Sequence, residues 1–256
     1  MGAKSMSRQP QWDSIGPPPV GLFAVEQARA LGELIKLRGR RDLVKRMHPG
    51  DGHAVMVLPG FLAGDYSTAP LRRFLRQLQY DTHAWREGVN LGPNREMLER
   101  INARLVKLHE LRGHKLSLVG WSLGGIYARE LARDNHERVR SVITMGTPLR
   151  DVTATHAARL FSLRGGRSSE ELDKIRSRLR QPVPVPCTSI FSKTDGVVNW
   201  RSCLQGEEPE SENIEVRCSH TGMGFHPAVL AIVADRLALT EGEWRPYTKV
   251  LKKTGS

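Results

Sequence analysis

A serine lies between two glycines in the run Gly120-Trp-Ser-Leu-Gly124, at the junction of two predicted elements. The apolar run 115–119 before it is typical of a buried strand, and in the run 125–133 after it apolar residues recur at helical spacing. A sharp turn from strand to helix, which the flanking glycines permit, holds a serine hydroxyl up at a strained point. The amides at the start of the helix then face the negative charge that develops on a substrate carbonyl. This pattern predicts Ser122 as a nucleophile.

A serine hydroxyl is a weak nucleophile until a base removes its proton, and the base needs a carboxylate to orient it. On some folds the three residues follow the chain order serine, acid, histidine. Asp195 suits the acid because it follows the predicted strand 185–191 and precedes a histidine-containing loop. Asp151 is the alternative, but it comes too soon after the predicted strand 139–145. We therefore expect Asp195 to be the acid.

Two histidines follow Asp195, and each is a candidate for the base. His220 comes soon after the predicted strand 213–217, in a loop whose two glycines can bring the imidazole over the serine. His226 immediately precedes Pro227, at the predicted start of the last helix, where a capping or packing role is the alternative. We expect His220 to be the base.

The oxyanion that forms when a serine attacks a carbonyl needs preorganised N–H donors. The backbone amide of Leu123, directly after the nucleophile, is the first candidate. The amide of Phe61 is the second, because it lies in the loop after the predicted strand 53–58. The side chains of Phe61 and Leu62 are candidates for lining an acyl pocket, and Trp121 is a further candidate for substrate binding.

Predicted strands and helices alternate along the chain, which indicates a mostly parallel sheet with helices on both faces. The strands are expected at 53–58, 82–85, 115–119, 139–145, 185–191 and 213–217. The helices are expected from 22 to 47, from Ser67 or Thr68 to 78, from a cap at Asn94 to 111, at 125–133 and at 227–237. In such sheets ligands bind at the carboxyl ends of the strands, where all the candidate loops lie.

Three segments extend or interrupt this alternation. Residues 1–50 are predicted to be a polar arm followed by an amphipathic helix that packs on the main domain, 51–246. Residues 149–182, with a basic helix at about 172–179, are expected to form a cap over the site, and 247–256 a polar tail. We expect one apolar stripe of the first helix to cover the core, although a helix lying on a lipid surface has the same pattern. The stripe consists of Leu22, Val25, Ala28, Leu31, Leu34, Ile35 and Leu37.

The 256 residues carry a net charge of +12, which can attract nucleic acid, anionic lipid or an acidic substrate. The basic residues are scattered among acidic ones and no nucleic-acid motif is present, so we expect a solvated basic surface and no nucleic-acid partner. Attraction to an anionic lipid surface stays open. No apolar run is long enough to span a membrane, and the first residues lack a secretory signal.

Three cysteines, Cys187, Cys203 and Cys218, cannot all pair within one chain. With no secretory signal they favour a reducing compartment and free thiols, and thus a cytoplasmic protein, with a Cys203–Cys218 bridge as the alternative. Their spacing does not match a zinc site. The expected chemistry needs neither a metal nor an organic cofactor.

Four runs of the sequence resemble the motifs of bacterial α/β-hydrolase esterases and lipases, with greatest similarity to the triacylglycerol lipase and PGAP-like hydrolase group. The runs are Leu58-Pro-Gly-Phe61, Gly120-Trp-Ser-Leu-Gly-Gly125, Ser192-Lys-Thr-Asp-Gly196 and Ser219-His-Thr-Gly-Met223, and the runs 234–238 and 241–246 resemble the C-terminal signature of the group. The resemblance covers about residues 50–246. It implies an α/β-hydrolase fold and hydrolysis of carboxylic esters through an acyl-enzyme. Pro59 is a departure, because many lipases have histidine there.

Two other functions use the same residues. An acyltransferase or thioesterase would use the same triad with a different acceptor or leaving group, which no motif here identifies. A non-catalytic binding protein of this fold would be expected to have lost a member of the triad, and none is lost here.

Overall fold

The computed structural model describes residues 15–38, 42–156 and 169–248. Six strands form one sheet in the order β2-β1-β3-β4-β5-β6, and every neighbouring pair is parallel. The strands are β1 (Ala54–Leu58), β2 (Asp81–Ala84), β3 (Leu116–Trp121), β4 (Val139–Met145), β5 (Cys187–Phe191) and β6 (Ser211–Glu215). The carboxyl ends of all six strands therefore lie at one edge of the sheet.

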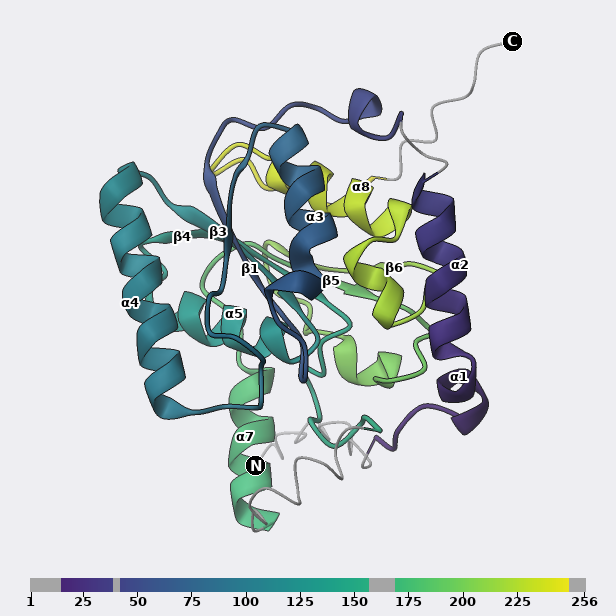
Figure 1. Cartoon of the computed structure of the whole chain (residues 1–256). Coiled ribbons are helices and arrows are strands. Elements are labelled where there is room, and N and C mark those ends of the chain that lie inside the picture. The colour runs from purple at the N-terminus through teal and green to yellow at the C-terminus, as the bar shows by residue number, and fades with distance from the viewer. Residues whose placement is uncertain (1–14, 39–41, 157–168, 249–256) are drawn as a thin grey trace, which may run out of the picture.

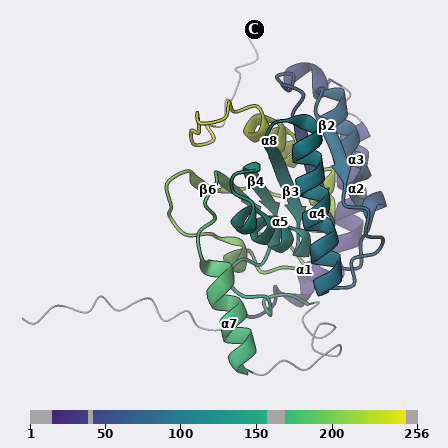
Figure 2. The same cartoon turned by 90° about the vertical axis from the view of Figure 1, so that its left-hand side faces the viewer.

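Helices cover both faces of this sheet (Figures 1 and 2). On one face lie α4 (Arg95–Arg112) and α5 (Leu123–Asp134), and on the other α3 (Asp65–Gln77) and α8 (Pro227–Leu237). The remaining elements are α1 (Val20–Ala24), α2 (Glu26–Arg38), α7 (Ser169–Arg180) and the short 3₁₀ turns η1 (Val44–Arg46), η2 (Trp200–Cys203) and η3 (Thr221–Gly224). No helix in these three described ranges is long and apolar enough to cross a membrane.

The central strands β1 and β3 are buried on both faces, which explains their nearly continuous apolar sequences, whereas the edge strands β2 and β6 are more exposed and more polar. All five residues of β1 are buried, and alternate residues supply different cores. Val55 and Val57 pack in the core beneath α3 and α8. Ala54, Met56 and Leu58 pack in the core beneath α4 and α5. The two-residue period of a strand thus divides one apolar run between two layers.

Most predicted elements are confirmed to within a few residues. Asn94 caps α4, and its side chain accepts hydrogen bonds from the amides of Glu96 and Met97. The start of α3 is a correction, because that helix begins at Asp65 after Gly64 and not at Ser67 or Thr68. Strand β6 ends at residue 215, two residues earlier than predicted.

The first predicted helix differs most from the expectation. It is divided into α1, α2 and η1, and residues 39–41 lie outside the described ranges. Leu31 and Ile35 are 61% and 60% exposed and Val25 is also exposed, so these residues of the predicted stripe do not cover the core, whereas Leu37 packs against it. The buried residues of α2 are instead Glu26, Ala30 and Glu33.

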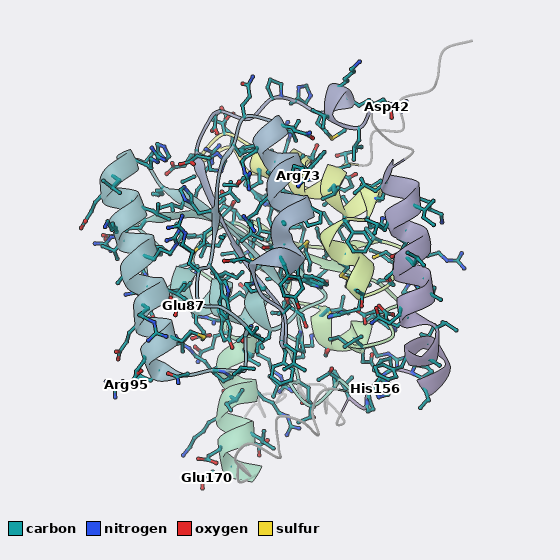
Figure 3. All side chains as sticks on the ribbon, in the orientation of Figure 1. Asp42, Arg73, Glu87, Arg95, His156 and Glu170 are labelled. Atoms are coloured by element: carbon teal, nitrogen blue, oxygen red, sulfur yellow. The ribbon has the colours of Figure 1, made fainter. Side chains whose placement is uncertain are left out.

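The segment 149–182 is described only in part, because residues 157–168 lie outside the described ranges, as do parts of the predicted arm and tail. Its basic helix is α7, which extends from the lower end of the molecule in Figure 1. His156, labelled in Figure 3, lies on the other side of the gap. The centroid of its ring is 4.6 Å from that of Phe23 in α1. The proposed domain limits and the cap stay predictions.

Candidate active site

Ser122 lies in a strained turn between β3 and α5. Its backbone angles are φ 53° and ψ −122°, a conformation that residues other than glycine rarely adopt. The Ser122 amide donates a hydrogen bond to the carbonyl of Met145 at 2.8 Å, which ties the turn to the end of β4. The serine is half-buried between two buried neighbours. Such strain at a partly accessible serine is typical of a nucleophile elbow.

The two glycines of this turn are required by close packing. A Cβ added to Gly120 would lie 2.3 Å from the Cα of Gly125 in the first turn of α5. A Cβ added to Gly124 would lie 2.3 Å from the carbonyl oxygen of Leu58, at the end of β1. Helix α5 therefore begins in contact with two strand ends, which positions its first amides at the carboxyl edge of the sheet.

Asp195 and His220 meet across the loops that follow β5 and β6. The Nδ1 of His220 and the Oδ2 of Asp195 are 2.7 Å apart, and both side chains are buried. The other carboxylate oxygen, Oδ1, accepts the amides of Val197 and Val198, each at 2.8 Å. These bonds fix the carboxylate, and the carboxylate fixes the imidazole ring.

The His220 ring packs against Gly146, just after β4, and lies near Trp121, the residue before Ser122. A Cβ added to Gly146 would lie 2.9 Å from His220 Nδ1, and the rings of Trp121 and His220 are 6.2 Å apart. Among the described residues, no hydrogen bond joins Ser122 to His220. Catalytic hydrogen bonds are commonly long in unliganded enzymes and tighten when substrate binds.

The electrostatic surroundings favour the protonated form of His220. Burial lowers the pKa of the imidazole, but the carboxylates of Asp195 and Glu26 outweigh this effect, so the pKa is raised above its ordinary value. These carboxylates stabilise the imidazolium that forms when His220 takes up a proton, and a general base needs such stabilisation.

The loop after β1 lies against the nucleophile. A Cβ added to Gly60 would lie 3.1 Å from the Cβ of Ser122, so Phe61 is the next residue along from this contact. Leu123 is the first residue of α5, and its amide therefore precedes the first intrahelical hydrogen bonds. The two predicted oxyanion donors thus belong to segments that converge on the serine.

Asn90, which the sequence analysis missed, holds this loop in place. It is fully buried, and its side-chain amide donates to the carbonyl of Pro59 at 2.9 Å. Its backbone pairs with the same loop, accepting from Leu62 at 2.7 Å and donating to Ala63 at 2.8 Å. The Tyr127 hydroxyl donates to the Asn90 side chain at 3.1 Å. These contacts support a loop in which proline replaces the histidine of many lipases.

The two predicted substrate-binding residues are placed differently. Leu62 is 50% exposed in the loop after β1, with a positive φ of 58°. Trp121 is buried and packs beside His220 and Gly224. Leu62 is accessible to a ligand, whereas Trp121 packs against the histidine loop.

The two alternatives for the acid and the base occupy other positions. Asp151 is buried, accepts hydrogen bonds from Thr153 and lies 3.2 Å from the Arg176 guanidinium of α7. His226 caps α8 by accepting the amide of Ala228 at 3.2 Å.

A second Ser-His-Asp arrangement lies at the opposite edge of the sheet. His53 contacts Asp51 through Nδ1, and its Nε2 lies 2.9 Å from the Ser117 hydroxyl. Ser117 is fully buried within β3 and bonds to Ser141 at 3.1 Å. His53 and Ser117 are buried, whereas the Asp51 side chain is 49% exposed and also binds Arg140, so we interpret this arrangement as a polar network that links the start of β1 to β3 and β4.

The described residues contain no group of three or more histidine, cysteine or acidic side chains that could hold a metal ion. Cys187, Cys203 and Cys218 are all free and buried. Burial raises the pKa of each thiol, so the neutral form is favoured.

Comparison with known proteins gives similarity at the level of structure only. No family model and no curated protein sequence matches the chain. Lipase B of Aspergillus fumigatus matches with a TM-score of 0.59 at 14% identity, over 80% of this chain and 58% of that one. The mature Bacillus licheniformis lipase BlEst2 matches with a TM-score of 0.56 at 14% identity, over 75% and 95%. A monoacylglycerol lipase of Paleococcus ferrophilus matches with a TM-score of 0.53 at 13% identity, over 74% and 96%. The chain has the α/β-hydrolase fold.

Proposed function

We propose that this protein is a serine hydrolase that cleaves carboxylic esters through Ser122, His220 and Asp195. The observation that carries the proposal is the strained Ser122 turn at the sheet edge where His220 and Asp195 are hydrogen-bonded at 2.7 Å. The three-dimensional similarity to lipases is consistent with this chemistry.

In the proposed mechanism, His220 accepts the proton of Ser122 as the hydroxyl oxygen attacks the ester carbonyl. The amides of Leu123 and Phe61 stabilise the oxyanion that forms. His220 then protonates the leaving alcohol, and an acyl-enzyme remains on Ser122. Water, deprotonated by His220, attacks the acyl-enzyme and releases the acid.

The surroundings of the site favour an ester with an apolar acyl group. Leu62, Val89 and Leu91 are at least half exposed on the loops after β1 and β2, and Tyr66 is exposed in the first turn of α3. These two loops are hydrogen-bonded to each other through Asn90. The proposed cap, 149–182, would complete the acyl pocket. An acyltransferase or thioesterase would differ only in acceptor or leaving group.

A fluorophosphonate probe and nitrophenyl esters of increasing chain length test this function. We expect covalent labelling of the wild type, and a kcat/KM that rises by about fourfold for each acyl methylene that the pocket buries. Mass spectrometry of the labelled peptide and initial rates are the measurements. A folded protein that neither labels nor turns over any ester would favour the binding-protein alternative, and equal turnover of monomeric and micellar ester would remove the lipase assignment.

The outer face of α2 supports a proposal for an anionic lipid surface as a partner. Ala24, Ala28, Leu31 and Ile35 form an exposed apolar stripe along α1 and α2, at the outer edge of the molecule in Figure 1. Lys36 is exposed on the same helix, and the chain carries +12. An exposed apolar stripe beside basic charge is typical of helices that bind anionic membranes.

The double variant Leu31→Glu with Ile35→Glu is expected to lower partitioning onto phosphatidylglycerol vesicles by at least about tenfold, because it removes two apolar contacts and adds repulsion. Vesicle flotation measures the bound fraction. Leu111→Glu is a matched control, since Leu111 is 68% exposed on α4. Equal flotation of all three proteins would contradict this role of α2.

A further inference from the structure

The inner face of α2 is polar and buried, unlike its outer face. Glu26, Arg29 and Glu33 are spaced by three and four residues, so they lie on one side of the helix. Only 1% of Glu26 and 7% of Glu33 is exposed. Buried carboxylates are costly unless hydrogen bonds compensate them, so their partners indicate what this face does.

The carboxylate of Glu26 joins the acid loop to the histidine loop. Its Oε2 accepts the amide of Gly196 at 3.1 Å, and Gly196 directly follows Asp195. Its Oε1 accepts the amide of Thr221 at 2.8 Å, and Thr221 directly follows His220. One side chain therefore binds both loops of the proposed triad.

Arg29 and Glu33 bind the residues that precede Asp195 and His220 in the sequence. The Arg29 guanidinium donates to the carbonyl and the hydroxyl of Thr194, which precedes Asp195, at 2.5 and 2.9 Å. Glu33 accepts the amide and the hydroxyl of Ser219, which precedes His220, at 2.8 and 2.5 Å. Helix α2 thus binds the residues before and after both the acid and the base.

Two glycines permit this close packing. A Cβ added to Gly196 would lie 2.5 Å from the carbonyl oxygen of Leu22 and 2.7 Å from Glu26 Oε2. A Cβ added to Gly222 would lie 1.7 Å from Glu33 Oε2. The loops carry glycine where the helix and its carboxylates approach most closely, so helix and loops form one packed unit.

We propose that α2 is a clamp that positions the acid and histidine loops, with Glu26, Arg29 and Glu33 as positioning residues for Asp195 and His220. The clamp binds backbone groups of residues 194, 196, 219 and 221 and the hydroxyls of Thr194 and Ser219, so it acts on the neighbours of the acid and the base. This inference rests on the proposed ester hydrolysis for its kinetic consequences, but the contacts themselves can be measured without a substrate.

Glu26 has a second effect, because its charge acts on His220. Asp195 from the acid loop and Glu26 from α2 act on the charge of this imidazole, and Arg29 and Glu33 of α2 bind Thr194 and Ser219 beside the pair. Burial lowers the pKa of His220, whereas Asp195 and then Glu26 raise it. Loss of the Glu26 charge is therefore expected to lower the pKa, and the acid limb of kcat/KM moves to lower pH.

Four variants distinguish the positioning of the two loops from the effect of the Glu26 charge on His220. Glu26→Gln keeps the side-chain length, but it removes the charge and one acceptor; Glu26→Asp keeps the charge and shortens the reach. Glu33→Gln disturbs only the histidine loop, and Lys107→Gln on the exposed face of α4 is the control. Amide hydrogen exchange in residues 194–196 and 219–221, and an NMR titration of His220, report on the clamp directly.

We expect faster exchange at both loops in the two Glu26 variants, and at residues 219–221 alone in Glu33→Gln. The His220 pKa should fall clearly in Glu26→Gln and less in Glu26→Asp. We expect kcat to fall by about 10- to 100-fold in the Glu26 variants, because small misplacements of catalytic groups are costly, and to be unchanged in Lys107→Gln.

Wild-type exchange rates and an unchanged His220 titration in folded Glu26→Gln would overturn the proposal. If Glu26→Gln does not fold, Glu26→Asp and Glu33→Gln decide the question by the same exchange measurement. A wild type without esterase activity, in which these variants still release the loops, would contradict the proposed function and leave the clamp standing.

Discussion

Replacement of Ser122 by alanine is expected to lower kcat/KM for the best nitrophenyl ester by at least about 10⁴-fold and to abolish fluorophosphonate labelling. The variant removes the attacking oxygen and leaves the proposed oxyanion amides in place, so the residual rate reflects binding and electrostatics alone. Alanine keeps the Cβ at the strained φ of 53°, so the fold should be retained. The measurements are initial rates over a range of substrate concentrations around and below KM and labelling at saturating probe, with circular dichroism as the test of folding.

Ser117→Ala is the matched control for this prediction. Ser117 is the serine of the second Ser-His-Asp arrangement, and its hydroxyl lies 2.9 Å from His53. Its loss leaves buried partners unsatisfied and is expected to cost about 1–3 kcal/mol of stability, with labelling and turnover preserved. Loss of labelling in Ser117→Ala but not in Ser122→Ala would move the nucleophile to the other edge of the sheet.

The strand-turn-helix around Ser122 could be predicted because its signals are local. An apolar run, two flanking glycines and a helical period are each visible within about 20 residues, and parallel strands bring their carboxyl ends to one edge. The chain order serine, acid, histidine then places Asp195 and His220 in loops at that edge. The structure brings these two residues into hydrogen-bond contact.

The orientation of α2 could not be predicted in the same way. Its apolar stripe suggested burial, but the inward face is set by partners nearly 200 residues away, such as the amide of Thr221 for Glu26. Hydrogen bonds to loop amides compensate the burial of two carboxylates, and no periodicity in the sequence reports those amides. The helical spacing of Glu26, Arg29 and Glu33 shows that they share one face of the helix. That spacing is equally typical of a face exposed to solvent.

Asn90 was missed for a related reason. An asparagine between glycine-containing turns is usually explained by the turn itself. Its role comes from tertiary contacts with Pro59, Leu62 and Ala63, in a loop that follows another strand. Loops that support a site through the backbone carry little sequence information about their partners.

Asp195→Asn is expected to lower kcat/KM by about 10³- to 10⁴-fold at neutral pH. In the wild type, His220 Nδ1 contacts Asp195 Oδ2 at 2.7 Å, which leaves Nε2 unprotonated and able to accept the serine proton. An asparagine amide donates to Nδ1 instead and favours the tautomer with its proton on Nε2. That tautomer cannot act as the base. Steady-state rates of the folded variant provide the measurement.

The pH profile of kcat/KM adds a second expected result, the direction in which its midpoint moves. The base must be neutral before attack, so kcat/KM falls as the pH drops through the His220 pKa. Burial lowers that pKa, but Asp195 and Glu26 raise it above the ordinary 6.5, so the wild-type midpoint should lie above that value. Asp195→Asn removes the carboxylate that raises the His220 pKa more strongly, so the midpoint should move to lower pH.

Asp151→Asn controls for the loss of a buried carboxylate elsewhere. Asp151 is also buried, but it pairs with Arg176 and contacts Thr153. Its variant is expected to keep the wild-type midpoint and rate while losing some stability. A full rate loss in Asp151→Asn, with Asp195→Asn unaffected, would assign the acid to the loop after β4. An unshifted midpoint in Asp195→Asn would instead mean that His220 does not set the acid limb.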